Sequence, residues 1–264
     1  MSFSRGPNIS TNGLVFCMDY ANVKSYPGSG SAIKSLMTVQ GSSGLPSGNV
    51  NGIVGIGTNN GTGQFITQGG GGMSRTSATA TTFTRFSSIP TTSHLSFFTG
   101  SFSLEAVFSP AGFADNTYFG LENVLIAKGP FSTLNYLMQF NSSQLTFCKR
   151  SGSESLIFRD FNATFTSGSI YDCVITVDGG DSNGVNNTVK AYQNGVLLGS
   201  SSLSGNIIEP RPGTTENLNV PAHGGSGSNT SMNFQGTYFV ARIYNRVLTD
   251  EEVLFNYESI KGRY

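Results

Sequence analysis

The chain has 264 residues, of which only 11% are charged, and its 15 lysines and arginines balance its 15 aspartates and glutamates. A neutral chain of this kind has no long-range field to attract nucleic acid or an anionic membrane, so we exclude both as partners. The sequence holds no run of about 18 uncharged apolar residues and no signal-peptide core near its start, which predicts a soluble protein made in a cytoplasm.

The residue types favour an all-β fold. The chain has 34 glycines, which suit tight turns, and 20 phenylalanines and 10 tyrosines, which can fill an aromatic core. That mixture is typical of many short strands joined by tight loops, and the length suits one β domain of about 200–250 residues. The three cysteines, Cys17, Cys148 and Cys173, are odd in number and lie in apolar runs, so we expect buried free thiols.

The N-terminal third carries the weakest structural signals. Residues 1–10 are poor in apolar side chains and predict an attachment arm that gains order from a partner. Residues 11–264 then form a single domain, which opens with an entry strand and a turn at residues 26–28. The stretch 29–80 predicts two or three short strands, with Gly-rich loops at 40–80 that would also contact partners.

Alternation of apolar and polar side chains strengthens after residue 83. Even-numbered positions from 102 to 108 carry Phe, Leu, Ala and Phe, and the odd-numbered positions between them are Ser103, Glu105 and Val107. The same period of two recurs, less cleanly, at residues 135–140, 144–149 and 169–177. These segments predict half-buried antiparallel strands in two packed sheets.

A hairpin is predicted at Asn194-Gly195. The strand Thr188–Gln193 leads directly into this pair, and both central residues of a type I′ turn need positive φ, which Asn and Gly adopt readily. The polar loop 178–187 precedes the strand.

The C-terminal segment predicts a strand followed by a capped helix. Thr249 is the expected N-cap, and Glu252 stands where a capping box needs a carboxylate. Gly262 is expected to form the C-terminal cap. The helix should pack on an apolar surface through one stripe, which consists of Val253, Leu254, Tyr257 and Ile260.

These closing residues resemble a known family. The segment 243–253, from a strand through Asn245-Arg246 to the acidic helix start, resembles the closing element of laminin-G-like domains with the concanavalin A-like jelly-roll fold. Residues 101–108, 171–179 and 189–199 resemble strands of the same family in the same order. The resemblance implies a two-sheet antiparallel sandwich with a short C-terminal helix.

The opening segment indicates a particular subgroup of this family. Residues 12–28 resemble a subgroup found in virion proteins of tailed phages, especially phages of cyanobacteria. The resemblance implies a structural protein on the exterior of a virion, as a capsid decoration or a tail appendage. Its partners would be phage capsid or tail proteins, with homo-oligomers also open, and its location would be the virion after synthesis in the host cytoplasm.

Catalytic groups are scarce. His94 and His223 are the only imidazoles, and no Gly-x-Ser-x-Gly motif occurs. Glycoside hydrolases need two carboxylates that flank the bond, whereas the strand that resembles theirs offers Glu105 alone. The sequence therefore predicts a protein that is not an enzyme.

A calcium site is the one metal candidate. Calcium takes about 6–8 oxygen ligands, and Asp178, Asp181 and Asn183 could supply several from one loop. The alternative is a polar loop whose side chains bond their own backbone. Residues 236–241 lack the acidic residues that often follow the glycine in the family's last strand, so we expect no tightly bound metal and no cofactor.

Glycan binding is the alternative function. In this reading the domain recognises a host surface polysaccharide through exposed tyrosines, such as Tyr118 or Tyr192, together with Asn194. Tryptophan, whose broad ring often stacks on sugars, is absent, so tyrosine and phenylalanine would have to substitute.

Overall fold

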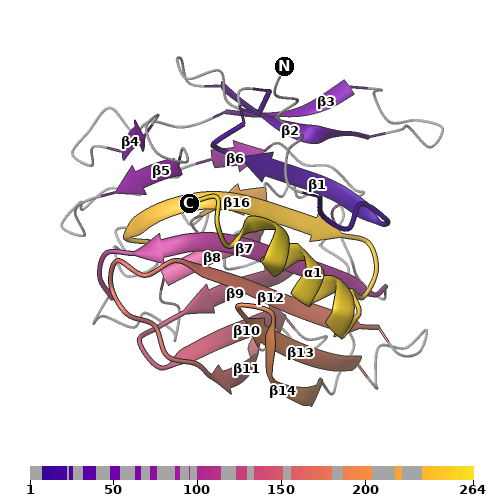
Figure 1. Ribbon diagram of the computed structural model, residues 1–264. Coiled ribbons are helices and arrows are strands. Elements are labelled where there is room, and N and C mark those ends of the chain that lie inside the picture. The colour runs from indigo at the N-terminus through magenta and orange to yellow at the C-terminus, as the bar shows by residue number, and fades with distance from the viewer. Residues whose placement is uncertain are drawn as a thin grey trace.

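The computed structural model describes most of the predicted strands and the helix. The described residues are 8–22, 24–25, 32–39, 48–53, 63–66, 72–75, 87–89, 95, 100–113, 123–129, 134–150, 156–179, 187–203, 218–221 and 234–264. They form two antiparallel sheets that pack face to face, with one helix, α1 (Asp250–Ile260), outside the sandwich (Figure 1).

The first sheet follows the order β14-β13-β12-β7-β16-β5-β4, and β1 also pairs with β16. Every pairing in it is antiparallel. Its strands, in chain order, are β1 (Leu14–Asp19), β4 (Gly63–Ile66), β5 (Gly72–Arg75), β7 (Phe102–Pro110), β12 (Tyr171–Asp178), β13 (Asn187–Gln193), β14 (Val196–Leu203) and β16 (Gly236–Tyr244).

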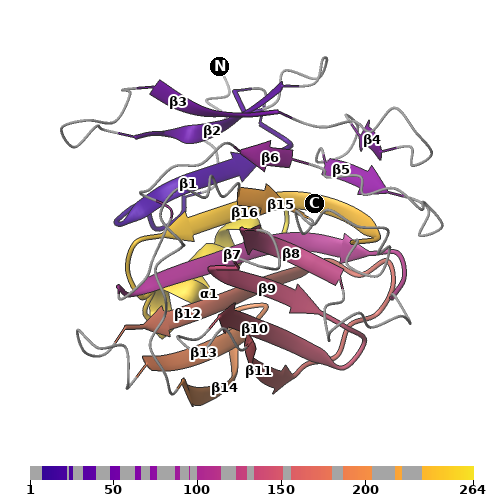
Figure 2. The same cartoon turned by 180° about the vertical axis from the view of Figure 1, so that it is seen from behind.

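The second sheet follows the order β11-β10-β9-β8-β15-β6-β3-β2. Figure 2 shows it from behind, with β8 to β11 nearest the viewer. Its strands are β2 (Ala32–Val39), β3 (Gly48–Ile53), β6 (Ser87–Ile89), β8 (Asn123–Lys128), β9 (Tyr136–Phe140), β10 (Gln144–Arg150), β11 (Leu156–Asn162) and β15 (Leu218–Val220). The all-β, two-sheet prediction is confirmed.

An aromatic core lies between the sheets. Phe108 of β7 meets Phe140 of β9 at a ring-centroid distance of 4.6 Å, and Phe165 lies 5.0 Å from Phe140. Phe234 and Tyr171 contact the same group, within 5.7 and 6.2 Å of Phe108. Several of the described phenylalanines therefore lie where the sheets meet.

The alternation predicted half-buried strands, but the central strands of the first sheet are buried on both faces. Ser103, Glu105 and Val107 on the outer face of β7 are each at most 1% exposed. Helix α1 lies over this face (Figure 1) and contributes Val253, Asn256 and Ile260 to it. The helix replaces solvent, so both faces of the central strands are buried.

The predicted start of the helix is confirmed, whereas the predicted apolar stripe is wrong in part. Thr249 and Glu252 form the capping box. The buried positions are spaced by three and four residues and include Asn256 in place of Leu254, which is 47% exposed. The helix ends with Lys261 as the C-cap in a right-handed conformation, so the C-cap predicted at Gly262 is wrong.

The N-terminal third also differs from expectation. Residues 29–80 contain four described strands, β2 to β5, where two or three were predicted. Residues 8–10 contact α1: the Ser259 hydroxyl donates to the Asn8 carbonyl, and the Ser10 amide donates to Asn256 at 2.8 Å. The packed part of the chain thus starts at or before Asn8, and residues 1–7 and the turn predicted at 26–28 lie outside the described residues.

The three cysteines are buried free thiols, as predicted. Burial raises the pKa of Cys17 to about 11, which leaves this thiol uncharged at neutral pH. Among the described residues, no helix is long and apolar enough to cross a membrane.

Candidate functional site

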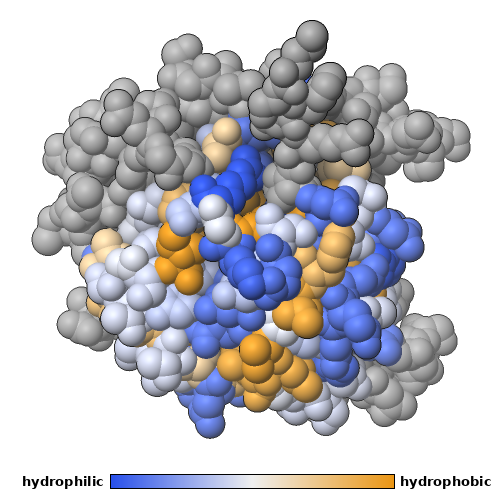
Figure 3. Space-filling model, viewed as in Figure 1, coloured by the Kyte–Doolittle hydropathy of each residue, from blue (hydrophilic) through white to orange (hydrophobic). Residues whose placement is uncertain are grey.

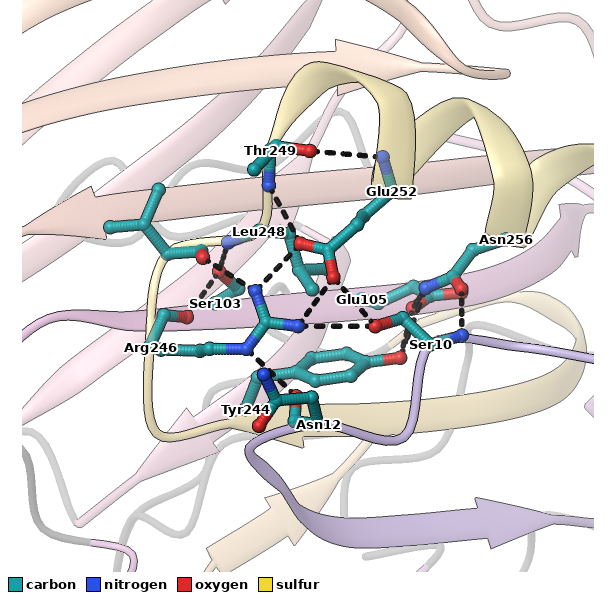
Figure 4. A network of polar contacts seen from close by, with 11 residues as sticks. Ser10, Asn12, Ser103, Glu105, Tyr244, Arg246, Leu248, Thr249, Glu252 and Asn256 are labelled. Atoms are coloured by element: carbon teal, nitrogen blue, oxygen red, sulfur yellow. Dashed lines mark hydrogen bonds and ion pairs between the residues drawn. The ribbon is translucent and has the colours of Figure 1, made fainter.

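A buried polar network joins α1 to the first sheet. Glu105 on β7 forms an ion pair with Arg242 on β16, and both side chains are at most 1% exposed. The second carboxylate oxygen of Glu105 accepts hydrogen bonds from Asn256 of α1 at 2.9 Å and from the Tyr244 hydroxyl at 3.2 Å (Figure 4). The carboxylate therefore has three donors from two elements and no access to solvent.

This network assigns a structural role to Glu105, the one carboxylate on the strand that was weighed as a hydrolase strand. Burial alone would lower the pKa of Arg242, but the Glu105 carboxylate together with the other acidic groups around it outweighs burial and raises the pKa above its ordinary value. A substrate could reach Glu105 only if α1 left the sheet. Within the described residues, Glu105 has no second carboxylate beside it that is open to solvent, so the paired acids of a glycosidase are not assembled there.

A second network fixes the start of α1. The Arg246 guanidinium donates to both oxygens of Glu252 at 2.6 Å, in bidentate geometry. Ser10 donates to Glu252 at 2.9 Å, and Arg246 donates to the Asn12 carbonyl at 2.8 Å (Figure 4). Mainly through the hydrogen bonds from Arg246, the pKa of Glu252 falls to about 2. Glu252, which completes the capping box, thereby also binds the N-terminal segment.

Asp172 on β12 is the unusual member of the buried face. Neither of its buried carboxylate oxygens has a hydrogen-bond partner among the described residues, and the same holds for Nε of Arg242. Burial and then the neighbouring Glu105 raise the pKa of Asp172 well above its ordinary value. This carboxyl is therefore held in its neutral form more strongly than an exposed aspartate.

Tyr192, which was predicted to be an exposed sugar-binding tyrosine, is buried. Its ring is 1% exposed and its hydroxyl donates to Asp250 of α1 at 2.7 Å, so the expectation that it is exposed is wrong. The sequence could not reveal this because Asp250 lies 58 residues away. Tyr118 lies outside the described residues.

The calcium candidates are only partly described. Asp178 is exposed at the end of β12, where it accepts a hydrogen bond from the Ser101 hydroxyl at 3.1 Å. Asp181 and Asn183 lie outside the described residues. Within the described part of the chain, no three His, Cys, Asp or Glu side chains cluster as metal ligands. Calcium at this loop stays a prediction.

Asn194 lies in the predicted turn. Asn194 and Gly195 have φ of 53° and 78°, which confirms the type I′ hairpin. The Asn194 side-chain oxygen accepts from the Asp172 amide at 2.9 Å. A Cβ on Gly195 would lie 2.9 Å from Cδ1 of Leu254, so the turn lies directly against α1.

This contact creates one continuous surface, which we call the hairpin–helix surface. It consists of the turn, the start of β14 and the outward side of α1, namely Asn194, Gly195, Val196, Leu197, Glu251, Leu254, Phe255 and Glu258. Five large hydrophobic residues are exposed among those described, and four of them, with exposures of 43–65%, belong to this surface. Figure 3 shows hydrophobic side chains on this face, over α1 and toward β14, between hydrophilic ones.

The hairpin–helix surface was missed at the sequence level, although one signal was available. Val253, Leu254 and Phe255 are consecutive, and three successive helical positions cannot all face the sheet, because each is turned by about 100° from the last. Val253 is buried and the other two are exposed. Three consecutive apolar residues in a helix therefore indicate that at least one of them is exposed.

The sequence matches a family model over residues 83–254, which run from before β6 into α1. The chain belongs to the concanavalin A-like lectin/glucanases superfamily. The match includes strand β7 with Glu105, the turn at Asn194 and the first half of the helix. A comparison with curated proteins finds no match.

Two solved structures with a similar fold are binding domains. The binding domain of Paraclostridial mosquitocidal protein 1 has 16% identity and a TM-score of 0.57, over 94% of this chain and 52% of that one. The receptor-binding domain of botulinum neurotoxin type G has 13% identity and a TM-score of 0.56, over 94% and 51%. This superfamily member thus spans about half the length of those two domains.

A third structure matches over nearly its full length. Domain 4 of AbnA, an extracellular arabinanase from Geobacillus stearothermophilus, was solved in complex with arabinotriose. It has 15% identity and a TM-score of 0.53, over 91% of this chain and 96% of that one. At these identities the likeness shows the fold.

Proposed function

We propose that this superfamily member is a non-enzymatic glycan-binding module that uses the hairpin–helix surface. The observation that carries the proposal is Phe255, which is 43% exposed on α1 and is the most exposed aromatic residue among those whose burial the structure describes. An open aromatic face can stack on the apolar face of a sugar ring. Phe255 takes the role that was predicted for tyrosine.

Polar groups beside the ring can receive sugar hydroxyls. Glu251 and Glu258 lie four residues before and three residues after Phe255, which places them on adjacent turns of the same helix side. Nδ2 of Asn194 has no hydrogen-bond partner among the described residues and can donate from the turn. Apolar area with a few directed polar groups is the usual composition of such a site.

The fold relatives add support. One matched domain was solved with arabinotriose. Two others are binding domains, of a mosquitocidal protein and of a neurotoxin, and the second is described as a receptor-binding domain. Fold alone does not determine function, so the argument rests on the surface. The sealed position of Glu105 supports a role without hydrolysis.

The test is titration of the full chain with a panel of neutral and charged oligosaccharides, followed by variants. Phe255→Ala should weaken binding about tenfold, equivalent to about 1.4 kcal/mol, and Phe255→Tyr should restore it because the ring returns. Ile170→Ala is the matched control, since Ile170 is 41% exposed but lies outside the hairpin–helix surface. Equal losses for both alanine variants, or no binding to any glycan, would reject the proposal.

A virion protein is the second candidate. The aliphatic part of the hairpin–helix surface, formed by Val196, Leu197 and Leu254, favours it, because exposed aliphatic patches are typical of protein contacts. In this proposal the chain is made in the host cytoplasm and attaches to capsid or tail proteins. Electron microscopy of particles from the source lysate tests it: density at a symmetric position supports attachment, and particles that lack the chain exclude it.

A further inference from the structure

We infer that the hairpin–helix surface discriminates by charge and accepts neutral or amino-bearing glycans in preference to sialylated or sulfated ones. The inference rests on the proposed function and adds the class of ligand. It depends on how the charged side chains around Phe255 are paired.

Among the described residues, each cation beside the hairpin–helix surface already has a carboxylate partner. The Lys190 ammonium lies 3.0 Å from a carboxylate oxygen of Asp250. Arg246 is held in its bidentate pair with Glu252. Lys261 pairs with Glu258 and lies 6.0 Å from the ring centroid of Tyr257. An anionic sugar would therefore have to break an existing ion pair before it gained a cation.

One carboxylate on this face has no such partner. Glu251 is exposed, and its side chain makes no hydrogen bond or ion pair with the other described residues. It lies four residues before Phe255, so the two side chains are neighbours on the helix surface. The local charge beside the ring is consequently negative.

The size of the effect follows from Coulomb's law. A ligand carboxylate about 7 Å from Glu251 in water is disfavoured by about one RT, which weakens binding about threefold. The chain as a whole is neutral, so no long-range field offsets this local repulsion. Salt should reduce the difference, because the groups are exposed.

The experiment compares matched pairs of glycans that differ only by a sialic acid or a sulfate. Wild-type chain should bind each neutral member at least about threefold more tightly, and the gap should shrink as salt is added. Glu251→Gln should close the gap at low salt, whereas Asp160→Asn should leave it unchanged. Asp160 is the matched control because it is an exposed carboxylate on β11 of the other sheet.

The outcomes separate this inference from the proposed function. If Phe255→Ala abolishes binding but sialylated or sulfated glycans bind as tightly as their neutral counterparts, the glycan site stands and the charge discrimination is wrong. A gap that persists unchanged in Glu251→Gln also overturns the inference. If no glycan binds, or binding is indifferent to Phe255→Ala, both proposals fail together.

Discussion

Replacing Glu105 by glutamine should destabilise the fold strongly, because it leaves the Arg242 charge buried without a counterion. The two side chains are 0% and 1% exposed. Glutamine keeps the volume and one side-chain oxygen, so no cavity forms, and the loss is electrostatic. Removing one partner of a buried pair costs roughly 3–5 kcal/mol of unfolding free energy.

This free energy translates into a large change in melting temperature. Unfolding entropy is about 2.1 cal/mol/K per residue, which for 264 residues gives about 0.55 kcal/mol/K. The predicted loss therefore lowers Tm by about 5–9 °C. Far-UV circular dichroism can follow the transition without tryptophan, which the chain lacks.

The matched control is Glu258→Gln on the same helix. Glu258 pairs with Lys261, but both side chains are nearly half exposed, and such surface pairs contribute about 0–1 kcal/mol. Its Tm should fall by less than about 2 °C. If Glu105→Gln lowered Tm no more than this control, the carboxylate would not be needed to hold α1, and its assignment as a structural residue would be refuted.

Three further predictions concern stability. Asp172→Asn should gain stability relative to wild type as pH rises from about 4 toward neutrality. The raised pKa of Asp172 stabilises the folded wild type while this carboxyl is protonated, and that contribution is lost as pH rises. Melting curves over this pH range test the prediction, and parallel curves for the two proteins would contradict it. Gly195→Ala should cost about 1–3 kcal/mol, since its Cβ would lie 2.9 Å from Leu254 Cδ1 at positive φ; faster amide exchange in α1 is the expected signature, and unchanged exchange would exclude the contact. Deleting residues 1–10 should lower urea stability by about 2 kcal/mol relative to deleting residues 1–7, through lost packing and hydrogen bonds to α1; equal stabilities of the two deletions would show that residues 8–10 do not support the helix.

Local signals in the sequence were sufficient for several elements. The capping box at Thr249 and Glu252 depends on residues three apart, and the Asn194-Gly195 turn depends on two adjacent residue types. Their geometry is set almost entirely by neighbours in the chain. These features were therefore predictable without knowledge of the sheets.

Features that depend on distant pairing were not predictable. Glu105 alternates with apolar residues in a pattern typical of a solvent-facing position, yet its partner Arg242 lies 137 residues away on β16. A bulge between Tyr238 and Val240 further disturbs the period of two on that strand, so that Tyr238 faces the inter-sheet core and Val240 faces α1. Register and bulges must be known before such a face can be assigned.

The position of α1 also moves the candidate site away from the sheet. An uncovered outer face with Glu105, Asp172 and Arg242 would be a charged surface suited to ligand chemistry. Because α1 covers it, Glu105 instead accepts a hydrogen bond from Asn256 of the helix, and the far side of the helix is left as the exposed surface. Leu254 and Phe255 would be unfavourable in water without a partner, so we expect function on the outside of α1, where the buried network keeps the helix rigid.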